Sequence, residues 1–335
     1  MAAKGSRAPT PKEHYAERAD DFKFKEGPRY DDLSYDRGPA SKPGTAPKQE
    51  EFLSARAEPW LIRAFDLEVG AVLGEGSFGV VRSAKWHGRT VAVKQVKKSL
   101  IGNESAVAEF EDEIGRMATL QTHENVVRFY GVVELANGDV GAVVEFCAQG
   151  ALSDALYGDK PKPFTAGQLL HIAYDAACGL MHLHANKIVH RDIAARNVLL
   201  AGKTDLVAKV SDFGMARDVA SVESGAEQVT KASIGPIRWM SPEQLERLAY
   251  SNASDVFAFG VLMYEIFERS VPWPGVANVN VITQVLGGKR MDLQLVPLDL
   301  RKLVQQCWMH SAKDRPTMQH VVATLQKSFT ASKPL

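Results

Sequence analysis

The sequence contains little cysteine and no excess of charge of either sign. Three cysteines stand among 335 residues, and the wide separation of Cys147, Cys178 and Cys307 argues against a disulfide framework. Such isolated cysteines are usual in a reducing compartment. Forty Lys and Arg residues balance forty Asp and Glu residues, so a general electrostatic attraction to nucleic acid or to an anionic membrane is not indicated.

Long apolar segments are also missing. The longest apolar run, from Val256 to Ile266, is interrupted by Glu265 and is too short to span a bilayer. The first residues lack the apolar core of a signal peptide. We therefore expect no membrane span and a cytoplasmic protein, with the nucleus as the alternative location.

The amino-terminal segment lacks the residues that build a core. Residues 1–58 contain no Val, Ile, Trp or Cys, although they hold six of the sixteen prolines. Such a segment cannot bury enough apolar surface to offset the chain entropy that folding removes. We predict a disordered tail over residues 1–58 and one folded domain over residues 59–335.

The folded part changes from strand-like to helical patterns along the chain. Residues 67–96 have the pattern of strands, with a hairpin turn at His87-Gly88-Arg89, and residues 104–120 have helical spacing. Further strands are predicted over 126–135 and 140–146, and helices over 166–184, 254–269, 279–286, 298–309 and 318–329. The sequence thus predicts an α+β fold, with a small β-rich lobe (about 59–146), a hinge (145–150) and a larger helical lobe (about 151–330).

A glycine-rich segment, Gly74-Glu75-Gly76-Ser77-Phe78-Gly79, lies within the predicted strands. Glycine lets the backbone approach phosphate groups closely and present its amide donors. The spacing alone is a weak signal, because a surface turn can have it too. A dinucleotide-binding fold needs a helix directly after the glycines, but a strand is predicted there, from Val80 to Trp86. The Lys-Ser/Thr pair of a P-loop is also absent.

A lysine ends the strand-like run Val91-Ala92-Val93-Lys94. On a strand, Ala92 and Lys94 share one face, so a small residue could cover a flat base while the lysine reaches phosphates. A lone lysine is usually a solvent-facing charge. Lys94 differs because it lies in an apolar strand and has a candidate partner, Glu113, on the helix predicted next.

The run from His190 to Asn197 reads His-Arg-Asp-Ile-Ala-Ala-Arg-Asn. It brings together a candidate base, Asp192, a candidate metal ligand, Asn197, and a positive charge, Arg196. The segment Asp212-Phe213-Gly214 follows further along the chain. Together with the glycine-rich segment and the lysine, these residues indicate phosphoryl transfer from ATP.

At these residues the chain resembles the protein kinase family, and most closely its tyrosine kinase and tyrosine-kinase-like group. The resemblance covers about residues 65–330, with the motifs in the family's order. The matching residues are Gly74, Gly76, Gly79, Val81, Val91-Ala92-Val93-Lys94, Glu113, His190-Arg191-Asp192, Asn197, Asp212-Phe213-Gly214 and Ser241-Pro242-Glu243. It implies a bilobal protein kinase fold and an enzyme that uses ATP and Mg²⁺ to phosphorylate a hydroxyl group of a protein substrate.

The resemblance also implies a role for each site residue. Asp192, with Arg196 beside it, would orient the acceptor hydroxyl and take its proton, and Asn197 and Asp212 would hold Mg²⁺. Lys94, paired with Glu113, would bind phosphates. The other contacts to ATP would come from the glycine-rich loop, the adenine pocket and the hinge: Leu73, Gly74, Glu75, Gly76, Ser77, Phe78, Gly79, Val80, Val81, Ala92, Val144, Glu145, Cys147 and Leu199.

Other matching residues are interpreted as structural. His190 is expected to pack with Phe213 in a hydrophobic column that links the lobes. Glu243 and Arg315 are expected to form a buried ion pair. Asp255 is expected either to cap its helix or to bind the backbone of the loop that carries Asp192.

The acceptor hydroxyl is indicated by residues around Asp192. Serine/threonine kinases usually carry a Lys two residues after this Asp, where this chain has Ala194, and its positive charge comes at Arg196, as in tyrosine kinases. Pro236 stands where serine/threonine kinases have a Thr, and it offers a flat apolar surface to a phenol ring. Tyrosine is favoured, and a serine/threonine or dual-specificity kinase of the tyrosine-kinase-like group stays open.

The segment between Gly214 and Pro236, the activation segment, contains no tyrosine. The usual switch of tyrosine kinases, a phosphotyrosine in this segment bound by Arg191, therefore has no substrate. The candidates in its place are Thr230, Ser233, Glu223 and Glu227. We hypothesise that activity does not need tyrosine phosphorylation of the activation segment.

Two other functions are alternatives. A pseudokinase scaffold usually lacks a catalytic residue, but Lys94, Glu113, Asp192, Asn197 and Asp212 are all present. The tail could instead act as a docking segment. The sequence predicts neither the physiological substrate nor the oligomeric state.

Overall fold

The computed structural model describes residues 60–76, 79–96, 113–135, 138–202, 206–212, 217–218 and 237–331. By its contacts the chain divides into Met1–Glu51 and Phe52–Leu335, and all described residues belong to the second unit. The predicted tail and the first half of the helix predicted over 104–120 therefore lie outside the described residues. The same holds for Ser77, Phe78, Phe213, Gly214, Glu223, Glu227, Thr230, Ser233 and Pro236.

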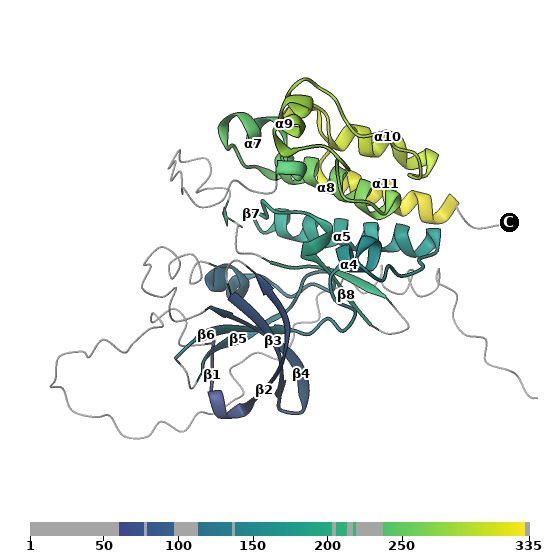
Figure 1. The fold of residues 1–335 in the computed structure, drawn as a ribbon. Helices are drawn as coiled ribbons and strands as arrows, with labels where there is room; N and C mark the ends of the chain where they lie inside the picture. Colours follow the sequence, from purple (N-terminus) through teal and green to yellow (C-terminus); the bar gives the residue numbers. More distant parts are fainter. Residues whose placement is uncertain are drawn as a thin grey trace, which may run out of the picture. The chain divides into compact units, whose positions relative to one another are not determined.

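The first lobe is built on a six-stranded sheet (Figure 1). Its strands are β1 (Leu61–Ile62), β2 (Leu67–Gly76), β3 (Gly79–Trp86), β4 (Arg89–Val96), β5 (Phe129–Glu134) and β6 (Val140–Glu145). Their spatial order is β1-β5-β6-β4-β3-β2, with β1 parallel to β5 and the other pairs antiparallel. The predicted hairpin forms between β3 and β4 around His87 and Gly88, which both have positive φ.

The predicted strand over 126–135 begins only at Phe129. The reason lies in the other lobe, because Val126 forms a bridge with Val210 and the Val127 N–H donates to the Val210 carbonyl at 2.9 Å. An apolar, strand-like run is thus divided between two pairing partners. Residues 113–119 are helical, as expected.

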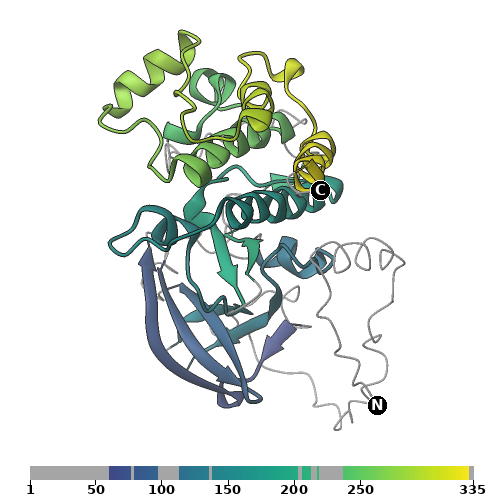
Figure 2. The same ribbon diagram turned by 90° about the vertical axis from the view of Figure 1, so that its right-hand side faces the viewer.

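The second lobe is mainly helical (Figure 2). Its helices are α4 (Leu152–Tyr157), α5 (Ala166–Ala185), α7 (Pro242–Arg247), α8 (Asn252–Glu268), α9 (Asn278–Leu286), α10 (Leu298–Cys307) and α11 (Met318–Ala331). Among the described residues, no helix has the length and apolar character needed to cross a membrane.

Helix α8 is the centre of this lobe. Every residue from Ser254 to Phe267 is buried, because α8 packs against α4, α5 and α10. A helix that is surrounded on all sides has apolar residues around its whole circumference, which explains the apolar run from Val256 to Ile266. Burial of Phe257 or Phe259 contributes about 1.5–3 kcal/mol each.

Helix starts follow capping signals in the sequence. Helix α5 begins after Thr165, whose hydroxyl accepts from the Gln168 N–H at 3.2 Å while the Gln168 side chain accepts from the Thr165 N–H at 2.9 Å. Helix α8 begins two residues earlier than predicted, because Ser251 and Ser254 form the same reciprocal pair.

Two short antiparallel ladders position the functional loops. Strand β7 (Ile188–Val189) pairs with β10 (Arg217–Asp218), and β8 (Val198–Ala201) pairs with β9 (Val207–Val210). The run from His190 to Asn197 connects β7 to β8 and ends in a 3₁₀ turn, Ala195–Asn197. Asp212 is the second residue after β9. Pairing of β8 with β9 therefore brings Asn197 and Asp212 to the same end of one ladder.

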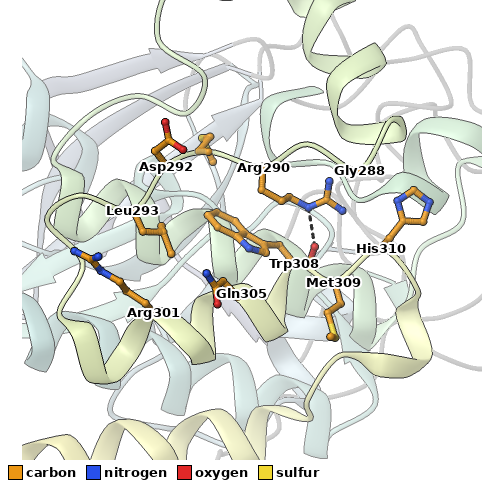
Figure 3. Close-up of a pocket in the computed structure, with 10 residues that line it drawn as sticks. Gly288, Arg290, Asp292, Leu293, Arg301, Gln305, Trp308, Met309 and His310 are labelled. Atoms are coloured by element: carbon orange, nitrogen blue, oxygen red, sulfur yellow. Dashed lines mark hydrogen bonds between the residues drawn. The ribbon is translucent and has the colours of Figure 1, made fainter.

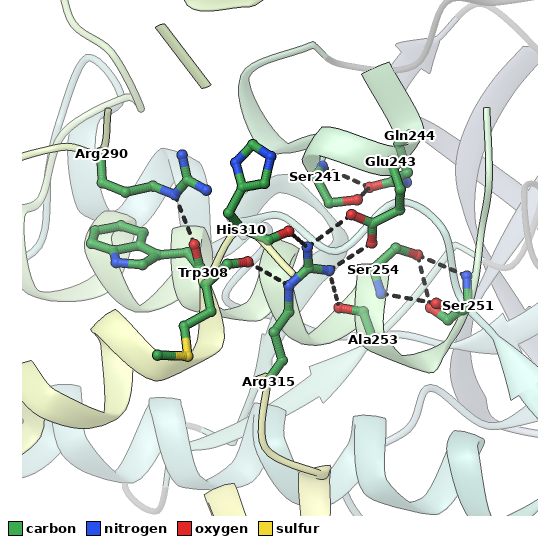
Figure 4. A network of polar contacts seen from close by, with 11 residues as sticks. Ser241, Glu243, Gln244, Ser251, Ala253, Ser254, Arg290, Trp308, His310 and Arg315 are labelled. Carbon is green, nitrogen blue, oxygen red and sulfur yellow. Dashed lines mark hydrogen bonds and ion pairs between the residues drawn. The ribbon is translucent and has the colours of Figure 1, made fainter. Parts of the chain in front are cut away.

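The predicted ion pair between Glu243 and Arg315 is present and buried (Figure 4). The two guanidinium NH groups donate to the two carboxylate oxygens at 2.6 and 2.8 Å. Three backbone carbonyls, of Ala253, Met309 and His310, accept the remaining donors of Arg315. Because every donor direction is used, the arginine ties α7, the start of α8 and the loop before α11 together.

Candidate active site

Four residues predicted to contact ATP share one face of the sheet. In the strand register, Val81 lies opposite Lys94, and Ala92 lies opposite Val144. Residues directly opposite each other in antiparallel strands share a face, as do residues two apart on β4. The alternate residues Val91 and Val93 point into the hydrophobic core of the lobe. The alternation of side chains along β4 thus places the candidate site and the hydrophobic core on opposite faces of the sheet.

The glycine-rich segment forms the closed end of the β2–β3 hairpin. Gly74 pairs with Val81, Glu75 with Val80, and Gly76 with Gly79. A strand does follow the glycines, as predicted, so a dinucleotide-binding turn is excluded. Leu73 lies at a break in register between Val72 and Gly74, and its side chain is 47% exposed.

Lys94 is held between two carboxylates. Its ammonium group lies 2.9 Å from Glu113 Oε1, which forms the predicted ion pair, and 3.0 Å from Asp212 Oδ1. Burial lowers the pKa of Lys94, but the charges of Glu113 and Asp212 outweigh it, so the pKa lies above its ordinary value. Lys94 therefore keeps its positive charge at neutral pH and links three distant segments of the chain.

The hinge connects β6 to the helical lobe. Glu145, the last residue of β6, forms an ion pair with Lys209 of β9 at 3.1 Å. The Cys147 carbonyl accepts from the Gly150 N–H at 3.1 Å, and Ala151 bridges to Leu199 of β8. The contacts bring Leu199 next to the hinge although it follows Cys147 by more than fifty residues.

The carboxylate of Asp192 is oriented by two later residues of its own loop. Arg196 Nη2 forms an ion pair with Asp192 Oδ1. Asn197 Nδ2 donates to the Asp192 carbonyl and to Oδ2, both at 2.7 Å. The guanidinium of Arg196 also lies over the Trp239 ring, with its Cζ atom 4.5 Å from the ring centre. A fixed carboxylate next to a cation and an aromatic surface is a suitable place for an acceptor hydroxyl.

The backbone before Asp192 is anchored on α8 by Asp255. This buried carboxylate accepts from the N–H groups of His190 and Arg191, both at 2.8 Å, and lies 2.9 Å from His184 Nε2. Of the two roles expected for Asp255, the structure thus has the contact to the loop backbone. His190 is fully buried, and its Nε2 lies 2.9 Å from the Ser211 carbonyl, next to Asp212. His190 thus contacts the backbone beside Asp212, while its expected packing with Phe213 lies outside the described residues.

Comparisons with known proteins show the family of the chain. A model of the protein tyrosine and serine/threonine kinase family matches residues 67–325. The chain belongs to this family. It is 36% identical over 293 residues to the megakaryocyte-associated tyrosine-protein kinase of Rattus norvegicus. The match covers 87% of this chain but only 59% of the rat protein, so the chain spans about three fifths of that relative's length.

The residues expected to hold Mg²⁺ in a kinase fit a hard cation. Asn197 supplies an amide and Asp212 a carboxylate, and oxygen ligands of these types suit Mg²⁺. The carboxylate of Asp212 is 43% exposed. Among the described residues, no three His, Cys, Asp or Glu side chains form a metal-binding cluster. Mg²⁺ is usually bound through one or two carboxylates together with water and substrate phosphates, and this pair of residues fits that pattern.

Glu265 and its hydrogen-bond partners were not predicted from the sequence. Glu265 Oε2 accepts from the Trp239 indole at 2.8 Å and from the Ala195 N–H at 3.0 Å, and Oε1 accepts from the Tyr157 hydroxyl at 2.6 Å. Burial raises the pKa of Glu265 to about 7, although these hydrogen bonds and the charge of Arg196 oppose the shift. The only signal in the sequence was an acidic residue interrupting the longest apolar run.

A separate surface cavity of about 450 Å³ lies in the helical lobe (Figure 3). It is lined by residues around Arg290, Arg301 and Trp308, and none of its lining residues belongs to the predicted site. Arg290 donates to the carbonyls of Trp308, Val285 and Lys289 at 2.7, 3.1 and 2.8 Å. Its donors thus hold the chain between α9 and α10 together, which is a structural role.

Proposed function

We propose that this chain transfers the γ-phosphate of Mg·ATP to a hydroxyl group of a protein substrate, and that tyrosine is the preferred acceptor. The observation that carries the proposal is a continuous set of contacts. Lys94 pairs with Glu113 and Asp212, the N–H of Ser211 beside Asp212 donates to the Asn197 carbonyl at 2.9 Å, and the Asn197 amide donates to Asp192. Membership of the kinase family supports it.

Each residue has a role that follows from its contacts. Lys94, which keeps its charge, neutralises negative charge on the phosphates of ATP, and Glu113 orients it. Asp192 accepts a hydrogen bond from the acceptor hydroxyl and takes its proton as the bond to phosphorus forms. Asn197 and Asp212 would hold Mg²⁺, which would neutralise negative charge on the phosphates of ATP. The chain contributes mainly orientation and electrostatic stabilisation, because phosphoryl transfer has a loose transition state.

The proposed pocket for ATP consists of the shared sheet face, the hinge backbone and Leu199. Val81, Ala92 and Val144 lie on that face. Glu145 and Cys147 lie at the hinge, which offers backbone donors and acceptors to the edge of a base. The backbone of the glycine-rich hairpin covers the phosphates in this proposal.

The tyrosine preference is supported by the surroundings of Asp192. Ala194 is fully buried and uncharged, so the cation nearest the proposed base is Arg196, which forms an ion pair with it. Arg196 lies against Trp239, and an aromatic acceptor would meet a cation and an aromatic surface together. The rat relative is named a tyrosine-protein kinase. Serine and threonine stay the alternative acceptors, because the family model covers both kinds of kinase.

Phosphoamino-acid analysis tests this proposal. A random peptide library is incubated with the protein and Mg·ATP, and a parallel reaction uses the Asp192→Asn variant. We expect phosphotyrosine to exceed phosphoserine and phosphothreonine, with no product from the variant. Phosphoserine or phosphothreonine alone would overturn the acceptor preference, and no phosphorylated peptide at all would overturn the activity.

We further propose that the protein acts in the cytoplasm. The three cysteines are buried free thiols, which suits a reducing compartment.

A further inference from the structure

Arg191, the residue before the proposed base, has a strained backbone. Its φ is +72°, in the left-handed region that non-glycine residues rarely adopt. The adjoining N–H groups of His190 and Arg191 are held by the two carboxylate oxygens of Asp255. Because Asp192 follows directly, its position depends on how firmly Arg191 is held.

The side chain of Arg191 is held by a tyrosine from the same part of the fold. Its Cζ atom lies 4.6 Å from the centre of the Tyr250 ring, within the range of a cation–π contact. Tyr250 directly precedes Ser251, the cap of α8, and Asp255 lies in the first turn of that helix. The start of α8 therefore contacts Arg191 twice, at its backbone and at its guanidinium group.

Tyr250 is also near the proposed base. Tyr250, Arg191 and Asp192 line one small enclosed cavity together with Trp239. Burial raises the pKa of the Tyr250 hydroxyl, the charge of Arg191 opposes this shift, and the charge of Asp192 adds to it. The ring is thus close enough to the base for the two to share an electrostatic environment.

The activation segment, in contrast, offers no tyrosine for Arg191 to bind as phosphotyrosine. A guanidinium group is attracted to an aromatic face as well as to a phosphate, and the aromatic contact does not depend on a kinase or a phosphatase. We infer that Tyr250 is a positioning residue that fixes Arg191, and through it Asp192, so that the site is ordered without tyrosine phosphorylation of the activation segment. This inference rests on the proposed phosphotransfer.

The test uses the full chain after treatment with a tyrosine-specific phosphatase. Wild type should keep its rate after this treatment. Tyr250→Leu should lower kcat about tenfold and leave the KM for ATP unchanged, because the ring is lost while the nucleotide pocket is untouched. Tyr250→Phe keeps the ring and should restore kcat to within about twofold of wild type. Thermal melting of each variant establishes that it is folded.

A matched control removes a similar contact elsewhere. Tyr130 on β5 lies under Arg89 and Arg128, at 5.6 and 5.8 Å from its ring centre, and is not part of the site. Tyr130→Leu should leave kcat unchanged. Arg191→Leu removes the Tyr250 contact from its other side, so it should lower kcat at least as much as Tyr250→Leu. The double variant should be no worse than Arg191→Leu alone.

Several results would overturn the inference. One is a wild-type kcat in Tyr250→Leu, and another is a fall in kcat in Tyr250→Phe as large as in Tyr250→Leu. The other two are a double variant in which the two single falls in kcat multiply, and a large fall in the wild-type rate after phosphatase treatment. If Tyr250→Leu does not fold, an unchanged kcat in Arg191→Leu would overturn it. Wild type without phosphotransfer would overturn the proposed function and this inference together, whereas an active wild type with a fully active Tyr250→Leu would overturn the inference alone.

Discussion

The lysine that the β lobe contributes to the site is less deeply buried than the two carboxylates that α8 contributes from the helical lobe. The Lys94 side chain is 23% exposed, its partner Glu113 is 7% exposed, and its other partner, Asp212 of the helical lobe, is 43% exposed. In the helical lobe, Asp255 and Glu265 of α8 are 1% and 0% exposed, and both accept hydrogen bonds from the backbone of the loop that carries Asp192.

This difference in burial predicts different effects of substitution on activity and on stability. A partly exposed charge contributes less to folding, because water screens it. Its loss should therefore change the electrostatics of the site more than the stability of the fold. A buried carboxylate with several donors is part of the fold, and losing it strands those donors. Lys94 should therefore be open to substitution without unfolding, whereas the carboxylates of α8 should not.

The largest effect is expected for Lys94→Met. Removing this fixed charge should lower kcat about 10²–10³-fold, because the variant loses the ammonium group that lies between Glu113 and Asp212. The melting temperature should fall less than in an α8 variant, because Lys94 is partly exposed, but the variant leaves the buried carboxylate of Glu113 without its cation. Steady-state kinetics and calorimetry on the same preparation check this. A fall in stability comparable to that of an α8 variant would contradict the comparison.

A large effect on stability is expected for Asp255→Ala. The N–H groups of His190 and Arg191 would lose their acceptor inside the protein, which should lower the free energy of unfolding by about 3–5 kcal/mol. Urea denaturation measures the change. Asp255→Asn, which keeps one acceptor oxygen, is the matched control and should lose less. If Asp255→Ala were as stable as wild type, the expected contribution of the buried α8 carboxylates to stability would be wrong.

A smaller, pH-dependent effect is expected at Glu265. Burial raises its pKa in the folded protein from 4.5 to about 7. Between these values the folded state binds the proton more tightly than the unfolded state, so this stabilisation is complete below pH 4.5 and is lost as pH rises through 7.

The Glu265→Gln variant lacks this titration, but its side chain can still accept from Trp239 and Ala195. Relative to wild type it should gain stability between pH 5 and pH 8, by at most about 3 kcal/mol. Melting temperatures of both proteins across this range give the difference. A difference that does not change with pH would show that Glu265 is already ionised in the folded state at pH 5.

The smallest effect concerns the hinge. Burial raises the pKa of the Cys147 thiol to about 12, with the charge of Glu145 adding to the shift. At pH 8 the thiol should therefore resist iodoacetamide, because the thiolate is the reactive form. Mass spectrometry of native and urea-unfolded protein measures the labelling, with the buried Cys178 as internal reference. Rapid labelling of Cys147 in the native protein would show that this rim of the site is more open than its burial indicates.

Much of the fold could be predicted because long periodic segments carry their own signal. The helices α5, α8, α9, α10 and α11 lie within a few residues of their predicted ranges. The six-residue helices α4 and α7 and the ladders β7–β10 and β8–β9 were missed, because such short elements show no full period. The early start of α8 could have been found from Ser251 and Ser254, which have the spacing of a reciprocal cap.

Some site contacts could also be predicted, and others could not. Lys94 and Glu113 were paired correctly, since a strand and the helix after it are neighbours along the chain. The second partner of Lys94, Asp212, comes from the other lobe, and no periodicity links residues so far apart. The division of residues 126–135 between β5 and a bridge to Val210 could not be predicted for the same reason, because Val210 is far away in the sequence and belongs to the other lobe.

The sequence by itself determined which chemical groups the site contains and which face of β4 presents them, because side chains alternate along any strand. It also determined that the activation segment has no tyrosine. Only the tertiary structure decided what holds these groups. Asp255 and Glu265 act on the loop of Asp192, and Tyr250 on Arg191, because the packing of α8 at the centre of its lobe brings them there. Burial also sets the protonation of Glu265, which depends on its surroundings and not on its neighbours in the chain.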